Sequence, residues 1–429
     1  MRHPVMGFEE RLRRIRGQAA GPDAVRPQPQ LNGSSLAERL HRLSTGGLPR
    51  ARAKPPDEAG LAESLGAVIL APGVLRLERR LPARLRHGRA LLGPLPGPWD
   101  LPWPLSGPPV PEGRMSTAHR GPGWLCLDTE TSGLAGGTGT WAFLTGLLRA
   151  GGDGWCLRQY VLTRLDAEPA YLDLIGAELN PADWLLTYNG RAFDAPLLAT
   201  RFRLAGRPDP VRALPHLDLL GPMRRAFGRT WPDCRLVTAE SRLLGFHRTD
   251  DLPGSAAPAA WLDWLRRGET APLAAVLRHN RDDLLSLAGL LSMLAAVYRD
   301  PASSQADIRA VAGTHAARGN AGLALRILAA SERGLDPAGL HDLARLCRRA
   351  GDWDRALGIW EGLAAQGDAP AREALARFHE HKSRDLRLAL ALTEALPPGA
   401  GRERRRERLK DKLRRGGGKL RLGSLGADG

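Results

Sequence analysis

Residues 124–130, WLCLDTE, begin as an apolar run and end in carboxylates. Such a run is typical of a central strand that is buried on both faces of a sheet. Asp128 and Glu130 are two residues apart, so on a strand their side chains project from the same face. Two like charges held together in this way favour a divalent cation such as Mg²⁺, which prefers oxygen ligands. The same pattern also fits a polar strand end that runs into a turn.

A second carboxylate follows another short apolar run. Residues 183–189, DWLLTYN, predict a buried strand, and Asp194 opens the helical pattern at 194–204. Asp194 is well placed to cap that helix, whose first turn contains Pro196. A carboxylate at a helix start is rigidly oriented, so a capping role is compatible with a role as metal ligand.

A third acidic motif, HNRDD at 279–283, lies within the long helical pattern at 271–298. His279 and Asp283 are four residues apart and share a helix face, whereas Asp282 points about a quarter turn away. Leucines beside them supply an apolar stripe. An exposed His–Asp pair is the alternative interpretation of this segment.

The patterns around these motifs predict an α/β fold with a mixed sheet, because strands come first and then alternate with helices. Residues 141–150 and 155–162 flank GGDG, which predicts a hairpin. Residues 66–77 predict two short strands around a Pro-Gly turn. Further helices are expected at 235–245 and 259–267.

A helical pattern repeats in the last third of the chain. Gly319 aligns with Gly351 and Ala324 with Ala356 at an offset of 32 residues, and a third, weaker copy places Ala389 one residue further on. Small residues at such positions let the two helices of a hairpin pack closely, and neighbouring hairpins bury one another's apolar faces. The pattern resembles a tetratricopeptide-type α-solenoid of about three units; a plain helical bundle is the alternative.

Three other features are expected to be structural. GTGTWA at 137–142 partly matches a dinucleotide-binding pattern, but it precedes a strand instead of opening a helix, so no nucleotide cofactor is expected. HEH at 379–381 lacks the spacing of a helical zinc site and is expected on a solvated helix face. Trp353 and Trp360 are expected to fill the repeat core, with base stacking as a secondary role.

The net charge of +16 is concentrated in two flanking segments. Residues 1–54 contain eleven Lys or Arg against four Asp or Glu, and residues 401–429 contain the same numbers. Such segments suit a polyanion such as nucleic acid, because each phosphate contact releases a condensed counterion. Solvated arms that only keep the protein soluble are the alternative.

Neither export nor a membrane partner is expected. The four cysteines lie far apart without a C-x-x-C pair, and no apolar run approaches the ~18 residues of a membrane helix. The first residues contain no apolar segment typical of a secretory signal. We therefore expect a cytoplasmic protein without a disulfide framework.

Taken in order, D-x-E on a strand, N-x-x-x-F-D at a helix start and H-x-x-x-D on a late helix resemble the DEDD exonuclease superfamily. LDTETSGLAGGTGTWAFLTGL, LLTYNGRAFDAPLL, CRLVTAESRLLGF, DDLPGS and HNRDD are similar to the YprB-type ribonuclease H-like family. Members of that family are predicted exonucleases, often followed by tetratricopeptide repeats. The resemblance covers 118–300 well, 305–396 loosely and neither tail.

The resemblance implies a set of site residues. Its metal carboxylates fall on Asp128, Glu130, Asp194 and Asp283, which would hold two divalent cations, Mg²⁺ or Mn²⁺. The superfamily's last motif has Tyr three intervening residues before Asp, or His with usually four, whereas His279 has three. His279 thus occupies the slot of the Tyr subtype, and we expect it to orient or deprotonate the attacking water.

The expected activity is metal-dependent 3′–5′ exonuclease hydrolysis of phosphodiester bonds in DNA or RNA by a two-metal mechanism. The alternatives are a non-catalytic nucleic-acid-binding scaffold and a ribonuclease H-like endonuclease. All four carboxylates are present, whereas a decayed site would be expected to have lost at least one. Nucleic acid is the expected partner, and the helical repeats suggest a protein partner as well.

Five segments are therefore predicted. They are a basic, mostly disordered segment at 1–60 with a helix at 35–43; short strands and a Pro-rich linker at 61–117; a ribonuclease H-like exonuclease domain at 118–300; an α-helical repeat domain at 305–398; and a basic flexible tail at 399–429.

Overall fold

The computed structural model describes residues 57–101, 123–133, 139–151, 154–181, 183–249 and 251–421, with side chains up to residue 415. The disorder expected over most of 1–60, the helix expected at 35–43 and most of the Pro-rich linker lie outside these residues. Helix α3 (Glu58–Leu65) begins inside the segment expected to be disordered. The Asp57 side chain caps it by accepting from the Gly60 amide at 3.0 Å.

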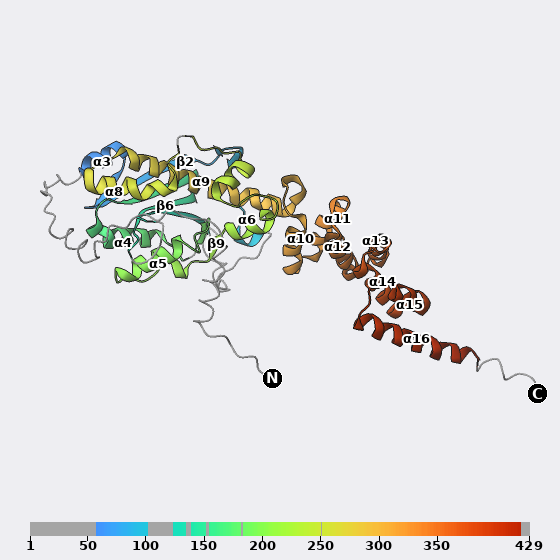
Figure 1. The fold of residues 1–429 in the computed structure, drawn as a ribbon. Helices are drawn as coiled ribbons and strands as arrows, with labels where there is room; N and C mark the ends of the chain where they lie inside the picture. Colours follow the sequence, from blue (N-terminus) through green and yellow to red (C-terminus); the bar gives the residue numbers. More distant parts are fainter. Residues whose placement is uncertain are drawn as a thin grey trace, which may run out of the picture. The chain divides into compact units, whose positions relative to one another are not determined.

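Seven strands form one mixed sheet in the order β1-β2-β7-β6-β5-β8-β9 (Figure 1). The centre is antiparallel, because β5, β6 and β7 follow one another through short connections, while β8 and β9 run parallel to β5. This arrangement confirms the predicted mixed sheet. The strands are β1 (Val68–Ala71), β2 (Val74–Pro82), β5 (Trp124–Thr131), β6 (Ala142–Gly151), β7 (Gly154–Leu162), β8 (Trp184–Thr187) and β9 (His216–Asp218); β3 (Leu85–His87) and β4 (Ala90–Leu92) form a separate pair.

The strands of the 61–117 segment belong to the main sheet. β2 pairs with β7 along its whole length, from Val74 opposite Leu162 to Pro82 opposite Gly154. The expected boundary at residue 118 is therefore not a structural boundary. The linker separates these strands from β5 in the sequence only, because backbone hydrogen bonds join them to the same ladder.

Helices cover both faces of the sheet (Figure 1). α4 (Glu168–Glu178) and α5 (Asp194–Leu204) lie along one face, and α8 (Ala257–Arg267) and α9 (Ala271–Arg299) along the other. Strand β5 is buried on both sides, since Leu125 and Leu127 join one apolar cluster while Trp124 and Cys126 join another. The continuous apolar run of 124–127 is thus explained by its central position.

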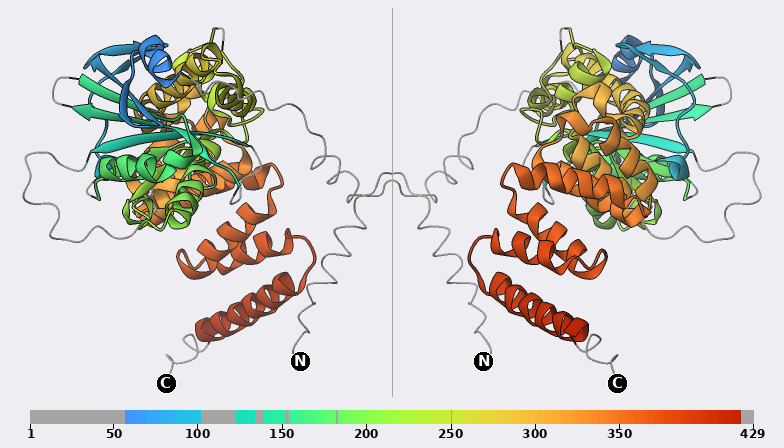
Figure 2. Two further views of the ribbon diagram at one scale, coloured as in Figure 1. Left: turned by 90° about the vertical axis from the view of Figure 1, so that its left-hand side faces the viewer. Right: turned by 90° about the vertical axis from the view of Figure 1, so that its right-hand side faces the viewer.

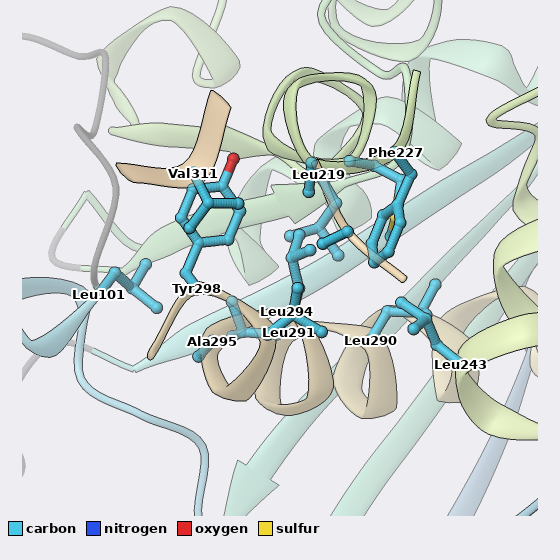
Figure 3. Close-up of a cluster of buried hydrophobic side chains, with 14 of the residues drawn as sticks. Leu101, Leu219, Phe227, Leu243, Leu290, Leu291, Leu294, Ala295, Tyr298 and Val311 are labelled. Carbon is cyan, nitrogen blue, oxygen red and sulfur yellow. The ribbon is translucent and has the colours of Figure 1, made fainter. Parts of the chain in front are cut away.

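The second half of α9 continues the apolar core toward the C-terminal helices (Figure 3). Leu290, Leu294 and Tyr298 pack with Phe227 of α6 (Leu220–Phe227) and Val311 of α10 (Ile308–Ala317). The Tyr298 hydroxyl donates to the Pro222 carbonyl at 2.9 Å. The α/β part and the first repeat helix therefore share one core.

Three helical hairpins follow one another with the predicted periodicity (Figure 2). Within each hairpin the turn contains a left-handed residue, Gly319, Gly351 or Arg384, directly before the residue that caps the second helix. The spacing is 32 residues and then 33, and an arginine in place of glycine explains why the third copy is weaker in the sequence. The assignment to tetratricopeptide repeats stays a prediction. The hairpins are α10 with α11 (Ala321–Ala330), α12 (Pro337–Ala350) with α13 (Trp353–Ala365), and α14 (Ala369–His381) with α15 (Leu386–Glu394).

Most of the segment expected to be a flexible tail, 399–429, is instead a helix, α16 (Ala400–Arg421), and residues 422–429 lie outside the described part of the chain. Leu409 is completely buried, and Arg408 and Lys412 bind the buried Glu380 of α14 at 2.8 and 2.7 Å. The prediction was wrong because a run of basic residues was taken to be solvated, whereas part of its charge neutralises a carboxylate on a neighbouring helix. Glu380 was also expected on a solvated face and is only 4 % exposed.

Within the part of the chain that the structure describes, no helix has the length and apolar character needed to cross a membrane.

Candidate functional site

Asp128 lies near the end of β5, where a buried amide fixes its carboxylate. Asn280 of α9 is completely buried, and its Nδ2 donates to Asp128 Oδ2 at 2.8 Å. Its Oδ1 accepts from Gln159 Nε2 on β7, also at 2.8 Å. The amide orientation follows from this chain of hydrogen bonds. Asn280 therefore orients Asp128 without being a charged residue itself.

A glycine makes room for this contact. Gly146 of β6 lies directly opposite Asp128 in the sheet. A Cβ atom at Gly146 would lie 2.1 Å from Asn280 Oδ1 and 2.7 Å from a Leu284 methyl carbon. Only glycine therefore lets α9 approach the sheet closely enough for Asn280 to reach Asp128.

Asp194 begins α5 and reaches back to β5. Its Oδ1 accepts from the Thr129 amide at 3.0 Å and from the Thr129 hydroxyl at 2.5 Å. No side chain caps α5, and its N-cap residue is Phe193, so the capping interpretation of Asp194 is wrong. The carboxylate instead connects the helix start to the strand that carries Asp128 and Glu130.

The turn before Asp194 is held by a further carboxylate. Asn189 has a left-handed backbone, with φ of 65°. Asp218 at the end of β9 accepts from the Asn189 amide at 2.7 Å and the Arg191 amide at 3.1 Å. This local network sets where the chain turns from β8 into α5, and hence where Asp194 lies.

Asp283 is engaged by an arginine that the sequence patterns had not singled out. Arg248 forms an ion pair with Asp283 and a bidentate pair with the completely buried Glu240, at 2.8 and 2.6 Å. Its guanidinium also lies 3.3 Å from Asp251. The π-helical turn at 240–244 and the loop after it, which carries Arg248, thus place one cation among several carboxylates.

His279 lies beside Asp283, as their shared helix face predicted. Its Nε2 lies 3.9 Å from Asp283 Oδ2. Its Nδ1 is 3.0 Å from Arg248 Nη1, a donor, and 2.8 Å from Asp251 Oδ1, an acceptor. Nδ1 donates to Asp251 in one tautomer and accepts from Arg248 in the other. Asp282 instead contacts Arg281, consistent with its predicted direction away from this face.

Among the four predicted carboxylates, Asp283 and Asp194 act on Asp128 and Glu130. Loss of hydration, followed by repulsion from Asp283 and Asp194, raises the pKa of both Asp128 and Glu130 well above the ordinary range. Burial also raises the pKa of Asp194. For Asp283 burial raises the pKa to about 6, although Arg248 opposes the shift. The structure therefore brings all four groups into one electrostatic cluster with too little positive charge.

The cluster borders a cavity of about 480 Å³, lined by Asp128 and Asp283 and also by Tyr188, Asn189, Arg224 and Arg235. The donor set is all oxygen, which suits Mg²⁺ or Mn²⁺. Among the described residues, no three His, Cys, Asp or Glu side chains already surround a single point in the manner of a metal site. Asp194 is hydrogen-bonded to Thr129, and Asp283 is paired with Arg248.

Residues that support the carboxylates escaped prediction, although each lies in a quoted motif or next to one. Glu240 belongs to CRLVTAESRLLGF, Asp251 to DDLPGS, Asn280 to HNRDD, and Arg248 lies just before DDLPGS. Their motifs were recognisable, but their roles depend on contacts with residues more than thirty positions away or on other elements.

Comparison with known proteins shows which family this chain resembles. A model of the RNase_H superfamily matches residues 125–295. YprB of Bacillus subtilis (strain 168) is 32 % identical over 282 residues, which cover 62 % of this chain and 67 % of that protein.

Solved structures give weaker matches. A family B DNA polymerase from Pyrobaculum calidifontis is 16 % identical with a TM-score of 0.30, covering 46 % of this chain and 29 % of its own. E. coli exonuclease I in complex with a dT13 oligonucleotide is 18 % identical with a TM-score of 0.25, covering 34 % and 42 %. The chain thus spans less than half of either structure. On the superfamily match and the identity to YprB, this chain belongs to the YprB-type family of ribonuclease H-like proteins.

Proposed function

We propose that the α/β domain is a divalent-metal-dependent 3′–5′ exonuclease that hydrolyses phosphodiester bonds in DNA or RNA. One observation carries the proposal: Asp128, Glu130, Asp194 and Asp283 come together from β5, α5 and α9, so that Asp283 and Asp194 raise the pKa of Asp128 and Glu130, and Asp128 and Asp283 line a cavity. They do so in a domain that matches a nuclease superfamily.

Such a cluster is costly unless cations neutralise it, because carboxylates held together in a poorly hydrated site repel one another. Phosphodiester hydrolysis has the complementary need, since negative charge develops at the attacking and leaving oxygens. When bound, two divalent cations supply that neutralisation and lower the pKa of the attacking water. Asp128, Glu130, Asp194 and Asp283 are the residues that would hold them.

The chain's own residues supply positioning and proton transfer. Asn280 orients Asp128, and Thr129 orients Asp194. In the tautomer that donates from Nδ1 to Asp251, His279 has its Nε2 lone pair available to accept a proton from water. Arg224 and Arg235 at the cavity wall supply positive charge for a phosphate.

The position of Arg248 also supports a second candidate function, a scaffold that binds nucleic acid without hydrolysing it. Because Arg248 already pairs with Asp283, a scaffold that binds nucleic acid without hydrolysing it would need no metal. If the domain is an exonuclease, metal binding at Asp283 must displace Arg248 or move Asp283. Because the metal would bind the folded state, a titration with Mn²⁺ should stabilise the protein as the metal site fills. A scaffold would show no such stabilisation.

The test is a product analysis with the full chain and Mg²⁺ or Mn²⁺. Oligonucleotides of DNA and RNA labelled at the 5′ end should shorten progressively from the 3′ end, and a blocked 3′ end or a circular strand should resist. Asp128→Asn purified in parallel should release product about 10³-fold more slowly. Cleavage of circles would indicate an endonuclease, and equal activity of Asp128→Asn would refute the assigned site.

A further inference from the structure

Two adjoining hollows lie on the C-terminal helices, which follow the carboxylate cluster in the sequence. The first is a cavity of about 490 Å³ between α12, α13 and α14, and the second, of about 480 Å³, lies between α14, the turn after α15, and α16. Both are lined by Pro370, Glu373 and Arg377, so they meet at α14. We call the pair the basic groove.

The charge of the basic groove is strongly one-sided. Glu373 is the only carboxylate among its lining residues. Eight Lys or Arg side chains line it: Arg345, Arg348, Arg377, Lys382, Arg402, Arg404, Arg405 and Arg408. A groove of this composition fits a polyanion.

Some of these cations are already used within the fold. Arg405 and Arg408 contact Glu380, and Arg345 pairs with Asp342. Within the described residues, no carboxylate forms an ion pair with Arg348 or Lys382. Two cations of the first hollow are thus available to an external anion.

Aromatic rings lie beside these available cations. Trp353 is half-buried, its ring centroid is 5.2 Å from that of Phe378, and Lys382 Nζ is 5.8 Å from its centre. Trp360 is only 5 % exposed and fills the hairpin core as predicted. The half-buried Trp353–Phe378 pair therefore lines the same hollow as these cations.

We propose that the basic groove binds a single strand of nucleic acid, with phosphates at Arg348 and Lys382 and a base on the Trp353–Phe378 pair. Cations that track the backbone beside aromatic rings that stack bases are what unspecific single-strand binding requires. An acidic peptide would meet the cations but offer no base for the aromatic pair. This inference rests on the proposed function, since it takes nucleic acid as the partner of the chain.

Binding is measured on the full chain with Asp128→Asn in EDTA, so that the strand is not degraded. Fluorescence anisotropy follows labelled dT20 and rU20 across a salt series. Arg348→Ala with Lys382→Ala should weaken binding at least tenfold and lower the salt slope by about 1.4, the value for two phosphate contacts on a single strand. Arg326→Ala with Arg333→Ala removes the same charge from exposed positions outside the groove and should leave both unchanged.

Stacking is tested with Trp353→Leu, which keeps apolar volume but removes the ring. Binding should fall about 5- to 150-fold with little change in salt slope. A folded state matching the parent by circular dichroism is required, and Phe378→Leu provides a second variant for the same surface. Wild-type affinity in both variants would overturn the stacking part of the proposal.

The outcomes also separate this proposal from the exonuclease. Without Asp128→Asn, the groove variants should raise KM and leave kcat unchanged. Strand binding that depends on the groove in a protein that degrades nothing would refute the exonuclease only. Active enzyme whose binding ignores the groove variants, or a poly-glutamate peptide that displaces the strand at equal concentration, would refute the groove.

Discussion

Glu130 of β5 and Glu380 of α14 are both buried, at 8 and 4 % exposure, yet their surroundings shift their pKa in opposite directions. Around Glu130, loss of hydration and the nearby Asp283 and Asp194 raise the pKa well above the usual 4.5. Around Glu380, hydrogen bonds from Arg408 and Lys412 outweigh burial and lower the pKa to about 2. The same type of side chain therefore has a poorly compensated negative charge in one region and a well compensated one in the other.

The difference distinguishes a carboxylate that the fold neutralises from one that the fold leaves uncompensated. Glu380 is neutralised by cations of its own chain, so it joins α14 to α16 and needs nothing further. The Glu130 cluster has Arg248 as a cation for several carboxylates, and Arg248 is also committed to Glu240. Charge that the fold leaves uncompensated is what a ligand can compensate.

The largest effect should follow from removing a carboxylate of the cluster. Asp128→Asn should lower hydrolysis by about 10³-fold, since metal-mediated charge stabilisation contributes several kcal/mol and each ~1.4 kcal/mol is tenfold. The metal-free protein should keep its fold and gain slightly in Tm, because repulsion falls. Single-turnover kinetics and a thermal melt in EDTA measure both. Undiminished hydrolysis, or a melt far below wild type, would remove the contrast with Glu380.

Removing the cation of the cluster should mainly affect stability. Arg248→Met leaves the completely buried Glu240 without its cationic partner, with the Ser286 hydroxyl still donating to it, which should cost about 3–5 kcal/mol of unfolding free energy. Urea unfolding measures the loss, and Arg266→Met on the exposed face of α8 is the matched control. Mn²⁺ should recover part of the loss by neutralising Asp283. A variant as stable as wild type would mean that Arg248 does not hold the cluster together.

Gly146→Ala tests the contact that orients Asp128. A methyl group 2.1 Å from Asn280 Oδ1 must push α9 or the amide away, at about 1–3 kcal/mol. Activity should fall with stability, because Asp128 loses its hydrogen bond. Gly221→Ala in α6 meets nothing within 4 Å and should be neutral or slightly stabilising. If both alanine variants melt alike, the packing of α9 on β6 is looser than the contact implies.

The smallest effect should come from the satisfied carboxylate. The folded pKa of Glu380 is about 2 against a usual 4.5, so its contribution is present above pH 4.5 and is lost as pH falls toward 2. We expect about 1–2 kcal/mol, reduced by solvent because Arg408 and Lys412 are 47 and 39 % exposed. Glu380→Gln should remove this pH dependence of stability at α16. Hydrogen exchange of the α16 amides between pH 2 and 5 measures it. An unchanged profile would assign the acid sensitivity to other groups.

Patterns local in the sequence were the predictable part of this molecule. The apolar run before Asp128, the strand before Asp194 and the helix carrying His279 and Asp283 were expected and are present. Three-residue strands such as β9 were missed, because they are too short to show a period. Helices α4 and α6 were also missed. Neither helix has a side-chain cap at its start, so the sequence lacks the usual signal for where they begin.

By itself, the sequence determined the α/β class and the repeated helical pattern, because the spacing of residues dictates which side chains share a face. The prediction of four metal carboxylates came from the resemblance to the YprB-type family. Only the tertiary structure decided what neutralises each carboxylate. Arg248 reaches Asp283 across 35 residues and Arg408 reaches Glu380 across 28. Charge compensation depends on distances of a few ångströms between elements, and a linear pattern does not contain those distances.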